Sequence, residues 1–200
     1  MPKLTKITPQ ITNPDRISLF ADGKFLTGLS LSTWAELGLK IGDELDPKLI
    51  ERLKNEDAIG KCYDKALKLL SFRPQSSHEL RQKLSKRFDD DKIKFTLARL
   101  TKEGLVNDER FAITWVNERV LTRHRSAQHL AAELRQKGVD RALIKSALSK
   151  LNKQSEVESA LSLAQKSSQK TPEKLRAYLA RRGFGYPIIR EVEKLLQAQE

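Results

Sequence analysis

The sequence predicts a mainly α-helical protein, an elongated tandem array of three three-helix units that follows a small β-rich N-terminal unit. Three observations predict this fold class. The alternation of apolar and polar residues that is typical of strands is confined to about the first 50 residues. From about Ala58 onward, the apolar residues recur with helical periodicity instead. Helix-capping residues then recur 50 and 45 residues apart, at Ser76, Ser126 and Thr171.

The N-terminal unit, residues 1–57, is predicted to contain a β-hairpin. The segment "RISLFADGKFLTGLS" alternates apolar and polar residues on both sides of Asp22-Gly23. This dipeptide tolerates the positive dihedral angles of a tight turn, so two antiparallel strands are expected.

A short helix is predicted after the hairpin, in "LSTWAELGL". Ser32 and Thr33 are possible caps, and Glu36 is placed to close a capping box from Thr33. The following "KIGDEL" indicates another short extended piece. We expect Trp34 to pack in the core of this unit rather than to form a ligand site.

The first three-helix unit is predicted at residues 58–106. Its first helix has one apolar face, formed by Tyr63, Ala66, Leu67 and Leu70. Arg73-Pro74 interrupts the helix, and Ser76 caps "SHELRQKL" with Glu79 at the capping-box position. The inward positions of the second and third helices are Leu80, Leu84, Ile93, Leu97 and Leu100.

The pattern recurs at residues 107–154 and 155–200. Asn107 or Asp108 can cap the first helix of the second unit, and Ser155 is expected to begin that of the third. In the third unit Thr171 caps the middle helix, and Pro172 occupies its first position, where a missing N–H has no cost. The apolar positions are Phe111, Trp115, Val116, Leu130 and Leu134, then Val157, Leu161, Ala164, Leu175, Leu179, Ile189 and Leu196.

The middle helices of the second and third units end in the same way, in "LAAELRQKGV" and "LRAYLARRGF". Gly138 and Gly183 are expected to adopt a left-handed conformation that stops each helix. Lys137 and Arg182 precede these glycines, where a cation is favourable at the negative end of the helix dipole. Because each unit has too few apolar residues for a core of its own, neighbouring units are expected to stack.

Charge is distributed unevenly along the chain, whose formal net charge is +12. Residues 1–60 hold 8 Lys and Arg against 9 Asp and Glu, whereas residues 61–200 hold 30 against 17. An excess of this kind favours polyanions or acidic protein faces as partners, although it also serves solubility. The single cysteine, Cys62, excludes an internal disulfide, and neither a signal peptide nor a membrane span is evident. We expect a cytoplasmic monomer that is not associated with a membrane.

The sequence does not predict an enzyme, a metal site or a cofactor. His124 and His129 are five residues apart, which places them on different helical faces. Cys62 is expected to be a packed thiol, and "DDD" at 89–91 a solvated loop. "GFG" at 183–185 lacks the lysine and the spacing of a phosphate-binding loop.

Basic residues recur around the middle helix of each unit and could form a discontinuous basic stripe. A single basic helix face is usually only solvated, so the recurrence is the informative feature. The first cluster contains Arg73, Arg81, Lys83, Lys86 and Arg87, the second Arg119, Arg123, Arg125, Arg135 and Lys137, and the third Lys174, Arg176, Arg181 and Arg182.

Four segments in this order resemble the RecX family of regulators of the RecA recombinase. They are "RPQSSHELRQKL", "GLVNDERFA", "HLAAELRQKGV" and "LRAYLARRGFGYPIIREV", and the resemblance covers roughly residues 58–200. It implies a cofactor-free modulator that lies in the groove of the RecA–DNA filament. Such a protein would inhibit ATP hydrolysis, strand exchange and coprotease activity, and would affect DNA repair, recombination and the SOS response.

The resemblance also assigns positions. The family's recurring residues correspond to Arg73, Ser76, Glu79, Leu80, Asp108, Phe111, Ala112, Arg119, Glu133, Leu134, Gly138 and Gly183. Leu80, Phe111, Ala112 and Leu134 are expected to stabilise the fold, and the charged residues are candidate contacts. Members often have a glycine before the second unit's middle helix, whereas "RHRSAQHL" has none.

Two other functions are compatible with the residues alone. A direct nucleic-acid binder would use the three-helix units as helix-turn-helix modules, without a recombinase partner. A scaffold could instead bind an acidic protein. A direct binder should show an affinity for DNA that falls steeply with salt concentration.

Overall fold

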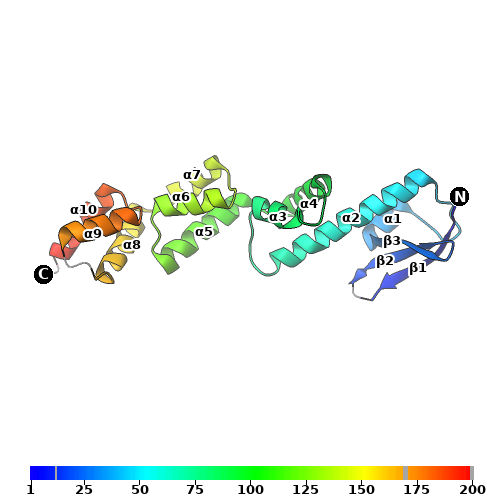
Figure 1. Cartoon of the computed structure of the whole chain (residues 1–200), viewed down its shortest axis with the longest axis horizontal. Coiled ribbons are helices and arrows are strands. Elements are labelled where there is room, and N and C mark those ends of the chain that lie inside the picture. The colour runs from blue at the N-terminus through cyan, green and yellow to red at the C-terminus, as the bar shows by residue number, and fades with distance from the viewer. Residues whose placement is uncertain (12, 169–170, 199–200) are drawn as a thin grey trace. The chain divides into compact units, whose positions relative to one another are not determined.

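The computed structural model describes residues 1–11, 13–168 and 171–198, and Figure 1 shows the order of the elements. The chain divides into two compact bodies. The N-terminal body comprises Met1–Arg73 and Leu80–Glu103, and the C-terminal body comprises Pro74–Glu79 and Gly104–Glu200. Helices dominate both, and a small sheet occupies the N-terminal end of the sequence, so the predicted mainly α fold class with a small N-terminal β unit is confirmed.

The sheet is antiparallel and has the order β1-β2-β3, with β1 at Leu4–Gln10, β2 at Asn13–Ala21 and β3 at Lys24–Ser30. The hairpin predicted at Asp22-Gly23 is confirmed: both residues have positive φ, 48° and 75°, and join β2 to β3. Strand β1 was not predicted. Glu44, in the predicted extended piece, forms an isolated bridge with Lys3.

Helix α1, Leu31–Leu37, is capped by Ser30, so the expectation that Ser32 or Thr33 is the cap is wrong. The Ser30 side chain accepts a hydrogen bond of 3.0 Å from the backbone N–H of Thr33. The helix starts earlier because the serine that ends β3 is already in the extended conformation that a cap needs. Trp34 packs against the core beneath the sheet, and its Nε1 donates to the carbonyl of Leu39 at 2.9 Å.

Helix α2 spans Pro47–Leu70, so the expectation that helical structure begins near Ala58 is wrong. Asp46 caps the helix by accepting from the backbone N–H of Leu49 at 2.7 Å, and Pro47 occupies its first turn. Leu53 is buried against the sheet. The domain boundary proposed between residues 57 and 58 falls inside this continuous helix, and the division into four domains stays a prediction.

Helices α3, Ser77–Leu84, and α4, Asp90–Lys102, complete the first predicted three-helix unit with α2. The predicted inward positions Leu80, Leu84, Ile93, Leu97 and Leu100 are buried. Cys62 is a buried thiol, as predicted, and burial raises its pKa.

The C-terminal body contains two further sets of three helices. The first set is α5 at Asp108–Arg123, α6 at Ala127–Gln136 and α7 at Arg141–Ser149, around a core that includes Phe111, Leu130 and Leu134. The second is α8 at Lys153–Gln165, α9 at Pro172–Arg181 and α10 at Tyr186–Gln197, around a core that includes Val157, Leu179 and Val192. Each set has its own core, so the expectation that single units have too few apolar residues for one is wrong.

Two helix ends in this body were not anticipated from the sequence, namely the start of α8 and the end of α5. Asn152 caps α8, so the expectation that Ser155 begins this helix is wrong; the Asn152 side chain accepts from the backbone N–H of Gln154 at 3.1 Å. Helix α5 ends at His124, whose φ of 49° is the left-handed conformation in which a glycine is usually found at the end of a helix.

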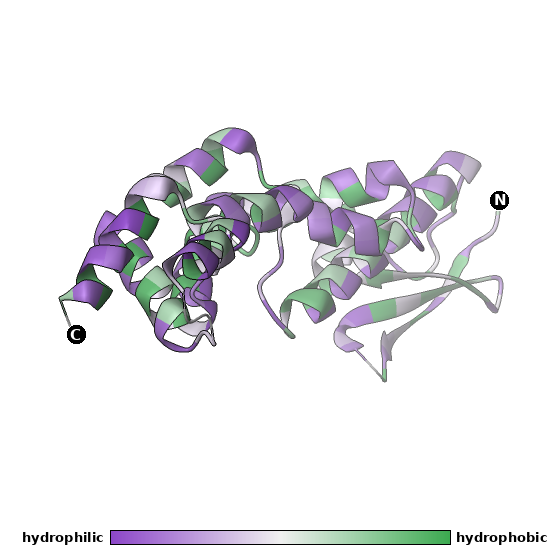
Figure 2. Cartoon of the chain, turned by 60° about the vertical axis from the view of Figure 1, so that its left-hand side comes forward, coloured by the Kyte–Doolittle hydropathy of each residue, from purple (hydrophilic) through white to green (hydrophobic). Residues whose placement is uncertain are grey.

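Hydrophilic and hydrophobic stretches alternate along the helices (Figure 2), as expected for helices with one packed face. In the part of the chain that the structure describes, no helix is both long enough and apolar enough to span a bilayer.

Candidate functional site

The cap of α3 is the centre of a junction between two sets of helices. Ser76 and Glu79 form the predicted capping box, in which Ser76 Oγ accepts from the Glu79 N–H at 3.1 Å and a Glu79 carboxylate oxygen accepts from the Ser76 N–H at 3.3 Å. The same Ser76 hydroxyl donates to the carbonyl of Lys137, at the end of α6, at 2.6 Å. The completely buried Ser76 therefore satisfies groups at two helix ends.

The same junction occurs one repeat later. Ser126 Oγ accepts from the backbone N–H of His129 at 3.3 Å and donates to the carbonyl of Arg182, at the end of α9, at 2.8 Å. Ser126 is also completely buried. Each unit is thus joined to the next by a serine hydroxyl that caps one helix at its N-terminus and another at its C-terminus.

A carboxylate adds a second bond to each junction. Asp108, in the first turn of α5, accepts from both the backbone N–H and the hydroxyl of Ser77. Glu156, in the first turn of α8, accepts from the backbone N–H of Ala127 at 3.1 Å. These N–H groups are helix-terminal donors without a partner inside their own helices, so the carboxylate of the following unit stabilises the N-terminus of the preceding middle helix.

Glycine is required at both junctions for two reasons. Gly138 and Gly183 have φ angles of 69° and 79°, which disfavour a side chain. A Cβ on Gly138 would lie 2.2 Å from Cγ of His78, and one on Gly183 would lie 2.7 Å from the Ser126 hydroxyl. The glycine at each ending therefore stops its own helix and also allows the close approach of the middle helix of the preceding unit.

Trp115 lies between two cations next to the first junction. The Arg119 guanidinium and the Lys137 ammonium each lie 4.1 Å from the centroid of the indole ring. The indole Nε1 donates to Glu133 at 2.9 Å, and Lys137 forms an ion pair with Glu79 at 2.8 Å. The cluster connects the capping box of α3 to α5 and α6.

Three of the predicted contact residues are largely enclosed by this cluster. The side chains of Arg119, Arg125 and Lys137 are 16%, 31% and 17% exposed. Nε of Arg119 and Nε of Arg125 lie 3.8 Å and 3.2 Å from Glu133. Arg119 and Arg125 thus share the carboxylate of Glu133, whereas Lys137 pairs with Glu79. These three residues stabilise the C-terminal body. A contact between any of them and a partner stays a prediction.

The other basic candidates are more accessible. Arg87, Arg123, Arg135 and Arg181 are exposed and form no ion pair with any residue that the structure describes. Arg81 pairs with Asp90, Arg176 pairs with Glu193 at 2.9 Å, and Arg182 lies over the ring of Tyr178. Arg73 and Lys83 have interactions of their own.

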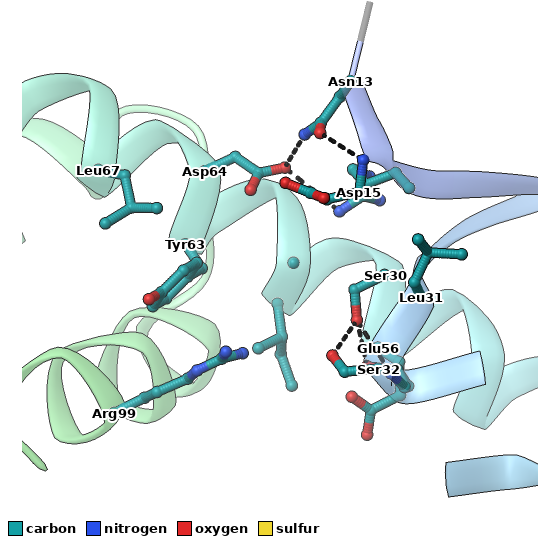
Figure 3. A pocket seen from close by; sticks show the side chains of 14 residues that line it. Asn13, Asp15, Ser30, Leu31, Ser32, Glu56, Tyr63, Asp64, Leu67 and Arg99 are labelled. Carbon is teal, nitrogen blue, oxygen red and sulfur yellow. Dashed lines mark hydrogen bonds and ion pairs between the residues drawn. The ribbon is translucent and has the colours of Figure 1, made fainter. Parts of the chain in front are cut away.

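The N-terminal body contains a polar pocket that the sequence did not predict, with a volume of about 380 Å³ (Figure 3). Its deepest group is Arg16 of β2, which forms a buried ion pair with Asp57 of α2 and contacts Asp64 at 3.4 Å. Thr27 also donates to Asp57, at 3.1 Å. These bonds hold the sheet against α2, and a Cβ on Gly60 would lie only 2.5 Å from the Arg16 guanidinium.

Tyr63 and Arg99 form the opposite side of this pocket (Figure 3). The Arg99 guanidinium lies 4.2 Å from the centroid of the tyrosine ring, and both side chains donate to Glu103. The hydrogen bonds from these two side chains lower the pKa of Glu103, and the bond from Tyr63 has the larger effect. Burial, followed by the bond to Glu103, raises the pKa of Tyr63. Among residues 1–11, 13–168 and 171–198, no group of three or more His, Cys, Asp or Glu residues is arranged to hold a metal ion.

Comparison with known proteins supports the resemblance along nearly the whole chain. The chain is 32% identical to regulatory protein RecX of Clostridioides difficile, over 98% of this chain and 97% of that protein. This chain belongs to the RecX family. It is also 32% identical to regulatory protein RecX of Bacillus licheniformis, over 94% of this chain and 75% of that protein.

Family models match three parts of the chain. They describe the N-terminal domain of regulatory protein RecX at residues 2–46, its first three-helix domain at 62–100 and its second at 107–148. A crystal structure of regulatory protein RecX has the same fold, with a TM-score of 0.85 at 24% identity over 97% of this chain and 100% of that one. The crystal structure of RecX from Lactobacillus salivarius gives a TM-score of 0.66 at 27% identity, over 71% of this chain and 98% of that one.

The positions that the resemblance assigned have a common structural explanation in this chain. Leu80, Phe111, Ala112 and Leu134 are buried. The polar and glycine positions Ser76, Glu79, Asp108, Arg119, Glu133, Gly138 and Gly183 lie in the two junctions and the Trp115 cluster. Sequence reasoning identified these residues but did not predict the bonds between repeats.

Proposed function

We propose that this chain regulates RecA by binding in the groove of the RecA–DNA filament, where it inhibits ATP hydrolysis, strand exchange and coprotease activity. The observation that carries the proposal is the relationship, along nearly the whole chain, to proteins named regulatory protein RecX. As a member of a family of regulatory proteins, the chain is proposed to act without catalysis of its own. It would act as a monomer in the cytoplasm, where such filaments form.

The exposed cations around the middle helices are the proposed contacts. Arg123 ends α5, Arg135 lies near the end of α6, and Arg181 ends α9. They are available to the filament because none of them forms an ion pair with a residue that the structure describes. Charge complementarity of this kind favours encounter with a polyanionic filament and sets the orientation of binding.

The test is ATP hydrolysis by RecA of the same organism on single-stranded DNA, titrated with this protein. Inhibition well below one molecule per RecA protomer is expected for a protein that acts on the filament. Charge reversal of the three proposed contacts, R123E/R135E/R181E, should raise the half-inhibitory concentration at least about tenfold because it places like charges against the filament.

A matched variant carries the same change of charge on other helices of the C-terminal body. K145E/K166E/R190E reverses three exposed cations that lie outside the middle helices, and it should inhibit nearly as well as the unaltered protein. An equal loss of inhibition in both variants would show that net charge, and not the position of the cations around the middle helices, determines binding. Absence of inhibition by the unaltered protein would exclude the proposed function.

Direct binding to nucleic acid is the second candidate function, and the positive charge of residues 61–200 favours it. The protein would then bind DNA without RecA, and the affinity would fall steeply as the salt concentration rises. Titration onto the same DNA in the absence of RecA distinguishes the two functions.

A further inference from the structure

Helix α2 carries a group of cations apart from the ion pair that it forms with the sheet. The carboxylates of Glu56, Asp57 and Asp64 lie on the side of the sheet and the polar pocket. Lys48, Arg52 and Lys54 line one open concavity on the outer surface of the helix. Lys48 and Arg52, four positions apart, share a helix face, and Lys54 lies at the other edge of the concavity. A nearly neutral segment of sequence therefore contains a strongly basic surface.

This surface, which we call the α2 basic face, is an open concavity of about 600 Å³. It is lined by Lys48, Glu51, Arg52, Lys54, Asn55, Ala58 and Lys92. Four of these residues are cations and one is a carboxylate. Lys92 reaches it from the first turn of α4, and its ammonium lies 3.5 Å from Asp89.

The three cations of α2 lack internal partners. Lys48, Arg52 and Lys54 are exposed and form no ion pair with any residue among those described. They differ in this respect from Arg16 and Lys61 of the same body, which pair with Asp57. Nothing in the packing of α2 requires three uncompensated positive charges around one concavity, because Leu53 on the opposite side makes the contact with the core.

We propose that the α2 basic face binds the phosphodiester backbone of a nucleic acid. Lysine, arginine and asparagine side chains are those that contact phosphates. The face has no large apolar residue at its centre, whereas protein–protein interfaces have an apolar core. It also has no aromatic side chain on which a base could stack, so the binding is independent of sequence.

The dimensions of the face fit a nucleic-acid strand. Lys48 and Asn55 are separated by seven residues of helix, or about 10 Å at about 1.5 Å per residue. This is the axial length of about three nucleotides of one strand of duplex DNA, at about 3.4 Å each. The face is therefore long enough to contact successive phosphates of one strand.

The inference does not depend on the proposed regulation of RecA, since it concerns a contact made by the N-terminal body. It assigns to this body a role in binding that its nearly balanced composition does not suggest. The chain would then have two separate surfaces for polyanions, the α2 basic face and the basic residues around the middle helices.

The test compares the full-length protein with K48Q/R52Q/K54Q, without any recombinase. Binding to a fluorescent duplex and to a fluorescent single strand is measured by anisotropy over a series of salt concentrations. Each lost phosphate contact should reduce the slope of log affinity against log salt concentration by about one unit. The slope for the triple variant should therefore be smaller by about three units. Glutamine is a good helix former, and circular dichroism should show unchanged helical content.

The control is K24Q/K40Q/K68Q, which removes the same charge from exposed lysines of the N-terminal body outside the face. Its salt dependence should remain that of the unaltered protein. An unchanged slope in the triple variant on both substrates, or an equal change in the control, would overturn the proposal. If the triple variant does not fold, R52Q alone should make the slope shallower by about one, and an unchanged slope would again overturn it.

Discussion

The hydroxyl of Ser76 donates a hydrogen bond of 2.6 Å to the backbone carbonyl of Lys137, 61 residues later in the chain. The same hydroxyl accepts from the N–H of Glu79, so one oxygen closes the N-terminus of α3 and the C-terminus of α6. Replacing Ser76 by alanine removes this partner from both backbone groups, which lie in a part-buried junction.

We expect Ser76→Ala to lower the free energy of unfolding by about 2 to 3 kcal/mol, because it removes a cap and also removes a hydrogen-bond donor from a part-buried carbonyl. Thr171→Ala is the matched control. Thr171 caps α9 through the N–H of Lys174, and the loss of a cap alone should cost about 1 kcal/mol. Both values are measured by urea unfolding followed by circular dichroism. Equal losses in the two variants would contradict the role of the bond to Lys137.

Gly138 allows a prediction about close packing that is separate from backbone conformation. Gly138→Ala places a Cβ 2.2 Å from Cγ of His78, in addition to the strain of a φ of 69°. We expect a loss of about 3 kcal/mol or more, from strain and overpacking together.

Gly104→Ala is the control for this prediction. Gly104 has a similar φ of 71°, but no atom lies within 4 Å of an added Cβ. Only the conformational strain should remain, at about 1 to 2 kcal/mol. If the two variants unfold at the same denaturant concentration, the approach of His78 does not determine the need for glycine.

The separation of internal from exposed cations can be tested by stability. Arg119→Glu would place a carboxylate beside Glu133 and remove a cation from the face of Trp115, and we expect it to cost on the order of 3 kcal/mol. Arg123→Glu, in the same helix but exposed, should change stability by less than about 0.5 kcal/mol. Tryptophan fluorescence during urea unfolding measures both effects, in a Trp34→Phe background that leaves Trp115 as the only tryptophan of the sequence. If Arg119→Glu is as stable as the unaltered protein, Arg119 is not needed for the fold and remains a candidate contact with a partner.

The buried ion pair between Arg16 of β2 and Asp57 of α2 predicts that removing one partner costs more stability than removing both. Asp57→Ala should cost about 3 to 5 kcal/mol, because it leaves the Arg16 guanidinium buried without its main counter-charge. Combining it with Arg16→Met removes the uncompensated charge and should recover part of the loss. Thermal unfolding of the two variants measures the difference, and a double variant less stable than Asp57→Ala would contradict this explanation.

The features that the sequence predicted are those decided by nearby residues. The hairpin at Asp22-Gly23 and the capping box of Ser76 depend on dihedral preferences and on contacts three residues apart. Ser30 was missed as a cap, because it also ends a strand and "STWAE" offers a capping box of its own. The junction bonds were beyond such reasoning, since Ser126 and Arg182 are separated by 56 residues.

The α2 basic face was missed for a different reason. Lys48, Arg52 and Asn55 have the spacing of a helix face in the sequence itself, so the signal was present. Placing the start of the helix near Ala58 rather than at Pro47 left this segment outside any helix. The total charge of the segment then concealed the face, because the net value does not distinguish the two sides of a helix.

Glu103 provides the prediction for pH dependence. Hydrogen bonds from Tyr63 and Arg99 lower the pKa of Glu103 in the folded state. A carboxyl whose folded pKa is depressed stabilises the protein above its unfolded pKa, about 4.3, and this contribution is lost as the pH falls through the folded pKa. Glu103→Gln should therefore reduce stability at pH 7 and should flatten the decline in stability below about pH 4. Urea unfolding at pH values between 3 and 7 measures both effects, and parallel curves for the variant and the unaltered protein would show that the bond to Tyr63 does not contribute to acid sensitivity.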